Sequence, residues 1–176
     1  MLLSYNRLVD IVDKGYLVGV EPEAINATSI DVRLGNKFLK EIPPAPDSVV
    51  DLSRRERINM DSRFGRYCLE PQEFILAHTE EVFNLPNHIS AEFSLKSSIA
   101  RNAMEHLNAC WIDAGFHNSV LTLELKNMTR YHRLLLVSGM YIGQIKFFEH
   151  EPVPDEQSYA TRGRYNNDHT VMGIRR

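Results

Sequence analysis

Most side chains with chemical potential lie in one stretch of the chain, residues 94–124. The stretch opens with a small cationic and hydroxyl cluster, Lys96, Ser97, Ser98 and Arg101. Hydroxyl donors and the planar fork of an arginine suit the oxygens of a phosphate group. The same pattern is also typical of a capped helix start whose charges are solvated. The cluster therefore predicts either an anion site or an ordinary helix start.

A lone acid among bulky apolar residues follows this cluster. Asp113 comes after Trp111 and Ile112 and is followed by Phe116. An acid at the end of a strand can stabilise a turn. It can also accept a hydrogen bond from a sugar hydroxyl while Phe116 covers the ring. Trp111 alone is more typical of a core residue than of a ligand platform. We interpret the group as a candidate slot for a sugar.

Glu124 is the candidate general base. It lies in residues 121–126, where period-two alternation places the leucines on one face and Thr122, Glu124 and Lys126 on the other. A solvated strand face explains this pattern, since glutamate is rarely buried. The functional alternative places Glu124 in a cleft, where it takes a proton from an attacking water.

The sequence argues against a zinc site. Cys68 and Cys110 stand far apart, and no Cys-x-x-Cys pair occurs. The His-x-Glu and Pro-Cys-x-x-Cys motifs of zinc nucleobase deaminases are also absent. His106 is interpreted as a satisfied structural histidine rather than as a metal ligand.

Size and composition indicate a single globular domain. The chain has 176 residues, of which 43% are hydrophobic and 24% charged, and a formal net charge of -3. This balance argues against a general nucleic-acid binder. The sequence shows neither a signal peptide nor a stretch approaching a membrane span. With only two cysteines, we expect a cytoplasmic protein without a membrane partner.

The surrounding pattern is mostly that of short strands. A helix is expected to start after Ser4, with apolar positions at helical spacing, and to stop at Gly15. Strands are predicted over residues 28–38, 74–78, 119–126, 134–137 and 141–148. Residues 41–63 are predicted to be a surface connection. The pattern favours an all-β barrel or sandwich with small helical decorations. From Glu149 onward the polar tail is either disordered or a flap that orders on ligand.

Taken together, these segments resemble the dCTP deaminase family of the dUTPase-like superfamily across nearly the whole chain. Residues 26–38 resemble the first hallmark of the family, and Lys-Ser-Ser-Ile-Ala-Arg at 96–101 resembles its usual Arg/Lys-Ser-Ser-Leu-Ala-Arg. Residues 111–116 and 123–125 resemble its nucleoside motifs, and residues 139–144 match the turn and strand that follow. Several matches in the right order are specific, whereas one alone would be weak.

The resemblance implies an architecture and a set of partners. The expected fold is a mainly β, distorted β-barrel or jelly-roll of the β-clip kind with a short N-terminal helix and small helical insertions. Residues 1–150 would form the nucleotide-binding catalytic domain, and residues 151–176 a tail that closes over a triphosphate. The resemblance also implies a homotrimer with active sites between subunits, Mg²⁺ bound through the triphosphate, and no zinc.

The resemblance also implies residue roles. Glu124 would be the base, Ser97 would help hold the catalytic water, and Arg101 would support the reacting centre. Ala109 would offer backbone contacts to the nucleobase. Asp113 would meet the deoxyribose 3′-hydroxyl, and Phe116 would pack on the sugar. The substrate-binding set is Lys96, Ser98, Ala109, Trp111, Asp113, Phe116, Gln144, Tyr159 and Arg164, and Gln144 and the tail would contact the nucleotide.

The chain also departs from the family pattern. Residues 101–109 are one residue short, and the loop 116–123 is one residue long. Asn108 stands where threonine is common, and Asp168 where glutamine is usual. We expect hydrolytic deamination of dCTP to dUTP and ammonia. The alternatives are a bifunctional enzyme that continues to dUMP and pyrophosphate, as in relatives with an aromatic residue at the Trp111 position, and a catalytically silent nucleotide-binding regulator.

Overall fold

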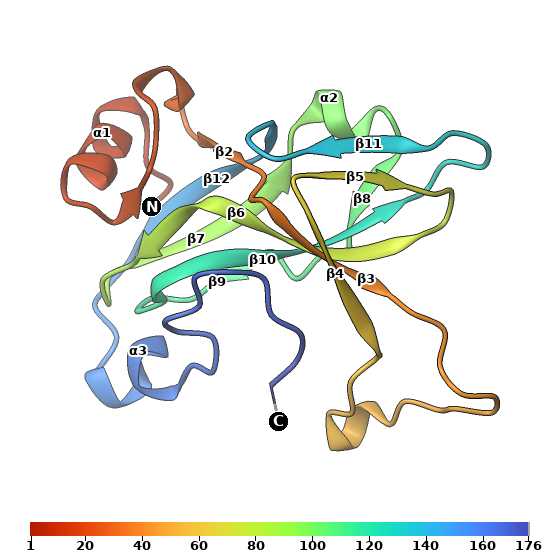
Figure 1. Cartoon of the computed structure of the whole chain (residues 1–176). Helices are drawn as coiled ribbons and strands as arrows, with labels where there is room; N and C mark the ends of the chain where they lie inside the picture. The colour runs from red at the N-terminus through yellow and green to blue at the C-terminus, as the bar shows by residue number, and fades with distance from the viewer. Residues whose placement is uncertain (176) are drawn as a thin grey trace.

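The computed structural model describes residues 1–175 as mostly β strands with a few short helices (Figure 1), which confirms the predicted mainly β class. The helices are α1 Tyr5–Asp13, η1 Pro22–Ala24, η2 Leu52–Arg54, α2 Ser97–Ala100, η3 Asp155–Gln157 and α3 Tyr159–Arg162. The strands are β1 Leu17–Val18, β2 Ile30–Arg33, β3 Lys37–Glu41, β4 Met60–Phe64, β5 Arg66–Leu69, β6 Phe74–Asn84, β7 Ile89–Leu95, β8 Met104–His106, β9 Trp111–Ile112, β10 His117–Asn127, β11 Leu134–Val137 and β12 Tyr141–Glu149. None of the helices described has the length and hydropathy to span a membrane.

Two antiparallel sheets form the body of the molecule. The larger has the strand order β4-β3-β6-β10-β8, with β1 beside β6, and the smaller has the order β2-β12-β7-β9. Strands β11 and β5 form a separate pair. The long strands β6 and β10 pair from Asn84↔His117 to Phe74↔Lys126. Glu124 therefore lies inside the larger sheet, whereas Asp113 follows the edge strand of the smaller one.

Aromatic side chains from both sheets fill the space between them. Phe38 and Phe83 come from the larger sheet, Phe93 and Phe147 come from the smaller one, and all four are almost completely buried. Large rings buried in this way remove much apolar surface from water and lock the layers together. The strands that carry the candidate site therefore rest on a packed core.

The predicted N-terminal helix is confirmed as α1. Its Leu8 and Ile11 lie three residues apart and are both buried, as expected for one apolar helix stripe. The chain leaves the helix through Gly15, whose φ of 70° favours glycine. Ser4 occupies the N-cap position, but its side chain makes no capping hydrogen bond.

The prediction of one strand over residues 28–38 is wrong, because the segment is divided into β2 and β3. At the division, the Gly35 N–H donates to the His78 carbonyl at 2.7 Å. A Cβ on Gly35 would lie 2.1 Å from the His78 ring. The backbone passes so close to β6 that only glycine fits, and the strand is interrupted there.

The prediction of a surface connection over residues 41–63 is right for most of its length and wrong at its end. Residues 60–63 belong to β4, which pairs with β3 through Leu39↔Ser62. β4 is a mostly exposed edge strand. An edge strand of this kind needs no buried apolar face, so its sequence shows no period-two pattern.

Strand β6 continues to Asn84, well beyond the predicted end at residue 78. The extension contains Glu81, of which 1% is exposed. Arg33 donates to the Glu81 carboxylate from its Nε and its backbone N–H, both at 2.9 Å. Burial raises the pKa of Glu81, while the hydrogen bonds from Arg33 oppose that rise. A charged residue inside a buried strand interrupts the apolar pattern from which strands are predicted.

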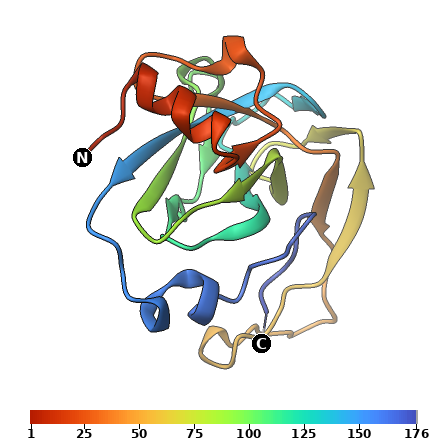
Figure 2. The same cartoon turned by 90° about the vertical axis from the view of Figure 1, so that its left-hand side faces the viewer.

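The tail has a defined path through residue 175. Helix α3 starts after Ser158, whose Oγ accepts a hydrogen bond from the Ala160 N–H at 3.2 Å. Further along, the Asp168 carbonyl accepts from the Val120 N–H at 2.8 Å, and Val171 is fully buried. The tail lies at the same end of the molecule as the 42–59 loop (Figures 1 and 2). Residues 151–175 therefore follow a defined path along the body of the molecule.

Candidate functional site

A cavity of about 710 Å³ lies between β10, the turn after β9, the 42–59 loop and the tail. It brings together residues that the sequence predicted from separate motifs. These are Ala109, Trp111, Asp113, Phe116, Glu124 and Tyr159. The volume falls in the range of small-molecule sites.

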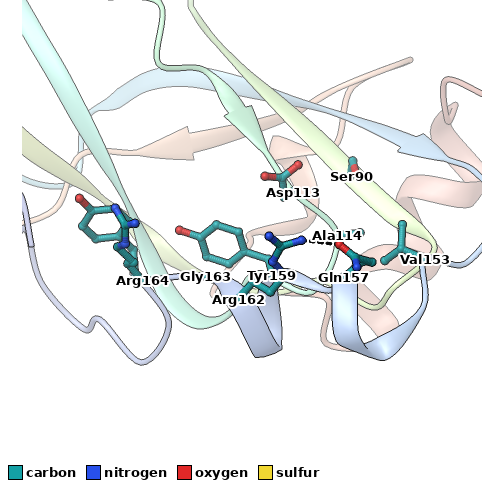
Figure 3. A pocket seen from close by; sticks show the side chains of 10 residues that line it. Ser90, Asp113, Ala114, Val153, Gln157, Tyr159, Arg162, Gly163 and Arg164 are labelled. Carbon is teal, nitrogen blue, oxygen red and sulfur yellow. Dashed lines mark hydrogen bonds between the residues drawn. The ribbon is translucent and has the colours of Figure 1, made fainter. Parts of the chain in front are cut away.

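A second cavity, of about 440 Å³, adjoins the first and shares Asp113, Tyr159 and Tyr165 with it. Figure 3 shows Asp113 and Tyr159 together with Arg162 and Arg164 around this smaller cavity. The Arg162 guanidinium donates to the side-chain oxygen of Gln157. The combined site has a carboxylate at the junction of the cavities and two cations in the smaller one.

Asp113 is held by its neighbours. Trp111 donates from its indole N–H to Asp113 Oδ1 at 3.0 Å, and the Phe116 N–H donates to the Asp113 carbonyl at 3.1 Å. Trp111 is 56% exposed and lines the large cavity, so it is not the core residue that its type alone would suggest. Phe116 is the buried partner, with its ring 6.0 Å from Phe83 and 5.6 Å from Tyr159.

Glu124 lies on β10 with 26% of its side chain exposed, and it lines the large cavity. Its Oε2 is 3.2 Å from His106 Nε2. This distance is that of a hydrogen bond, but the alignment is not, and both atoms are buried without a partner. His106 is buried as expected, but it is not satisfied.

The phosphate motif of the sequence does not line either cavity. Ser97, Ser98 and Arg101 are exposed on α2 and at its end, and Lys96 forms an ion pair with Asp31. Helix α2 lies at the opposite end of the molecule from α3 (Figure 1). A single chain therefore does not unite this motif with the cavities.

Gln144 lies beside this motif rather than in the cavities. It pairs with Asp31 across β12 and β2, and its Oε1 accepts from Ser29 Oγ at 3.3 Å. We call Lys96, Ser97, Ser98, Arg101 and Gln144 the α2 group. The predicted site residues thus divide into the α2 group and the residues that line the cavities.

Sequence reasoning missed part of the cavity wall. Three residues of the 42–59 loop line the large cavity: Val50, Leu52 and Ile58. The sequence around them is typical of a surface loop and gives no indication of a binding site. Asp168 also lines it and forms an ion pair with Arg175. Burial raises the pKa of Asp168, while Arg175 opposes the rise.

A family model described as dCTP deaminase-like matches residues 2–150. The chain belongs to the dCTP deaminase-like family. The resemblance drawn from the motifs is therefore confirmed, and with it the expectation of a deaminase-family enzyme.

Relatives agree with this family assignment. A "dCTP deaminase, dUMP-forming" of Methanospirillum hungatei is 37% identical over 158 residues, which cover 86% of this chain and 83% of the relative. A protein of the same name from Persephonella marina is 31% identical over 181 residues, which cover 99% of this chain and 97% of the relative.

Solved structures support the fold. The 2′-deoxycytidine 5′-triphosphate deaminase of Agrobacterium tumefaciens superposes with a TM-score of 0.65 at 20% identity and covers 85% of this chain. The match spans about half, 48%, of the length of that chain. A dUTPase of Streptococcus mutans superposes with a TM-score of 0.51 at 15% identity, covering 76% of this chain and 87% of its own. The predicted dUTPase-like fold of this member of the dCTP deaminase-like family is confirmed.

Proposed function

We propose that this chain hydrolytically deaminates dCTP and then cleaves the resulting dUTP to dUMP and pyrophosphate. The observation that carries the proposal is that Glu124, the predicted base, and Asp113, the predicted sugar contact, line one cavity. Relatives at 31–37% identity carry the name "dCTP deaminase, dUMP-forming".

The nucleotide would extend across both cavities. The cytosine would lie beside Glu124 and Ala109, and the deoxyribose would meet Asp113 and Phe116. Arg162 and Arg164 line the smaller cavity, and their guanidinium forks suit phosphate oxygens. This order places the reactive carbon near Glu124 and the phosphates at the cationic end.

Glu124 would act as the general base of the deamination. Bulk water is a poor nucleophile at neutral pH, so a positioned carboxylate must take its proton as the oxygen attacks C4 of the cytosine. Glu124 would then return protons to N3 and to the leaving amine. Ammonia and dUTP result.

The α2 group would come from a neighbouring copy in a homotrimer. In one chain, Ser97 and Arg101 line neither cavity, although both are exposed and available. A second copy that places its α2 over the large cavity would let Ser97 hold the water and Arg101 stabilise charge at the reacting centre. Lys96 would leave Asp31 or remain behind the site.

Mg²⁺ would enter with the triphosphate. Within residues 1–175, no three His, Cys, Asp or Glu side chains gather as a metal site. Phosphate oxygens and water would supply most of the ligands of Mg²⁺. The ion would neutralise phosphate charge, while Tyr159, Arg162 and Arg164 of the tail close over the nucleotide.

The second step would use Asp113. It lies at the boundary of the two cavities, where it could orient a water toward the α-phosphate. The sequence alone ranked deamination without this step first. The dUMP-forming relatives and the position of Asp113 now favour the bifunctional reaction over that alternative and over a silent nucleotide-binding protein.

Product analysis tests the proposal. Purified protein is incubated with dCTP and Mg²⁺, and the nucleotides are separated by anion exchange. We expect dUMP and pyrophosphate. Accumulation of dUTP would reduce the function to deamination alone, and unchanged dCTP would refute it.

A variant of the base sharpens the test. Glu124→Gln should keep nucleotide binding but lower deamination by roughly a hundred- to ten-thousand-fold, because an amide cannot accept the proton from water. Glu41→Gln, an exposed change on β3, is the matched control and should be neutral. Near wild-type turnover of Glu124→Gln would show that the base is assigned wrongly.

A further inference from the structure

Within residues 1–175, the buried side-chain atoms without a hydrogen-bond partner are His106 Nε2 and Glu124 Oε2. They lie 3.2 Å apart on the neighbouring strands β8 and β10. Buried polar groups almost always have partners, so an unpartnered pair calls for an explanation. Here one of the two atoms belongs to the proposed catalytic base.

The backbone holds the two residues beside each other. His106 is opposite Leu125 in the β8–β10 register, and the Leu107 N–H donates to the Glu124 carbonyl at 3.1 Å. The Phe93 ring lies with its centroid 4.8 Å from that of His106. The imidazole is therefore packed beside the carboxylate, with its Nε2 3.2 Å from Glu124 Oε2.

The chemistry of the two groups determines where the proton must be. An ionised carboxylate can only accept hydrogen bonds. If the imidazole proton were on Nδ1, a lone pair of Nε2 would face a lone pair of Glu124 Oε2. With the proton on Nε2, the ring donates to the oxygen, and both buried atoms are satisfied.

We propose that His106 is a positioning residue for Glu124, a role that rests on the proposed deaminase function. Its Nε2–H donates to Glu124 Oε2 and fixes the carboxylate so that Oε1 faces the cavity. The exposures fit this division, because 26% of the Glu124 side chain is exposed against 7% for His106. His106 does not line either cavity and so acts through Glu124.

The role has a consequence for the proton path. The proton of the attacking water goes to Oε1 and leaves from the same oxygen toward N3 of the cytosine. The His106 proton stays on Nε2 throughout. Anchoring one oxygen prevents the carboxylate from turning away between the two proton transfers. Such a turn would carry the proton on Oε1 away from the cytosine ring.

Two substitutions separate the hydrogen bond from the shape of the ring. His106→Phe keeps an aromatic ring and removes the donor, whereas His106→Gln places an amide N–H near the position of Nε2. We expect His106→Phe to lower kcat for dCTP about ten- to a hundred-fold, equivalent to about 1.4–2.7 kcal/mol, with KM changed by less than about twofold. His106→Gln should recover most of the loss. His132→Phe, at an exposed histidine, is the control.

A double-mutant cycle tests whether His106 acts through the base. If it does, His106→Phe costs little further activity in a Glu124→Gln background. The proposal would be overturned if His106→Phe cost a similar amount of activity in both backgrounds, or if His106→Phe kept the wild-type kcat. The proposed deaminase function would still stand in either case, provided that the wild-type protein deaminates dCTP. Wild-type protein without dCTP deamination would instead refute the proposed function.

Imidazole ¹⁵N NMR provides a readout that does not depend on activity or on the Phe variant folding. We expect the His106 ring to carry its proton on Nε2 in the wild-type protein and its signal to move in Glu124→Gln. A ring that is protonated on Nδ1 alone, or a signal unaffected by Glu124→Gln, would overturn the inference.

Discussion

Gly115 connects the candidate site to the tail, and an added methyl group should separate them. It lies in the turn between β9 and β10 with a φ of 88°. A Cβ at this position would be 2.1 Å from Ser158 Oγ and 2.9 Å from the Ala160 backbone nitrogen. Gly115→Ala should therefore release α3 from the turn that carries Asp113.

The expected magnitude has two parts. A left-handed backbone costs an L-residue about 1–2 kcal/mol wherever it occurs. The clash also forces Ser158 Oγ away from Asn87 Oδ1, to which it donates at 2.6 Å, and from the Ala160 N–H that it caps. Loss of the cap costs about 0.5–2 kcal/mol and loss of the hydrogen bond about 0.5–1.5 kcal/mol. Only this second part, about 1–3.5 kcal/mol, is specific to the tail.

Gly139→Ala is the matched control. Gly139 has a φ of 83°, but a Cβ there meets nothing within 4 Å, so this variant has the backbone cost alone. Trypsin cleavage after Arg162 and Arg164 reports tail opening, and urea unfolding reports global stability. We expect Gly115→Ala to be cleaved about ten- to a hundred-fold faster than the control, which corresponds to about 1.4–2.7 kcal/mol of opening. Equal cleavage rates and equal unfolding midpoints for the two variants would refute the reasoning.

Two further predictions concern the tail and the acid stability of the fold. Truncation after Pro154 should leave a folded core and lower kcat/KM for dCTP about a hundredfold, because two charge-assisted phosphate contacts contribute roughly 3 kcal/mol together. Circular dichroism checks the fold, and steady-state kinetics measure kcat/KM. Unchanged kinetics would exclude the tail from function. Burial lowers the pKa of His78 below its ordinary 6.5. Below pH 6.5 the unfolded state therefore binds more protons than the folded state. The free energy of unfolding decreases as the pH is lowered, by at most about 1.4 kcal/mol per pH unit. Urea unfolding between pH 7.5 and 5.5 should show a smaller slope for His78→Gln, and equal slopes would contradict the assignment.

The fold could be predicted from the sequence wherever apolar residues repeat at a regular spacing. Strand β11 matches the predicted residues 134–137, and β10 and β12 extend the predicted segments by only a few residues. The pattern failed where the environment was not apolar. Glu81 continues β6 because Arg33 neutralises it from another strand, and no local window contains that information.

The candidate site could be predicted in its chemistry but not in its assembly. Glu124, Asp113 and Phe116 were found from their motifs, and they do line one cavity. Sequence reasoning could not find the wall formed by Leu52 of the 42–59 loop, because that contact depends on chain segments far apart. The His106–Glu124 contact was missed for the same reason, since it depends on the pairing of β8 with β10.

The separation of the α2 group from the cavities has a consequence for mixtures of chains. If a working site takes Glu124 from one copy and Arg101 from another, then a chain defective in one residue still contributes an intact partner for the other. Two inactive proteins, Glu124→Gln and Arg101→Ala, should regain activity when they are unfolded together and refolded as mixed assemblies. In such mixed assemblies, some interfaces would contain both defects. Other interfaces would combine the intact Glu124 of one chain with the intact Arg101 of its neighbour.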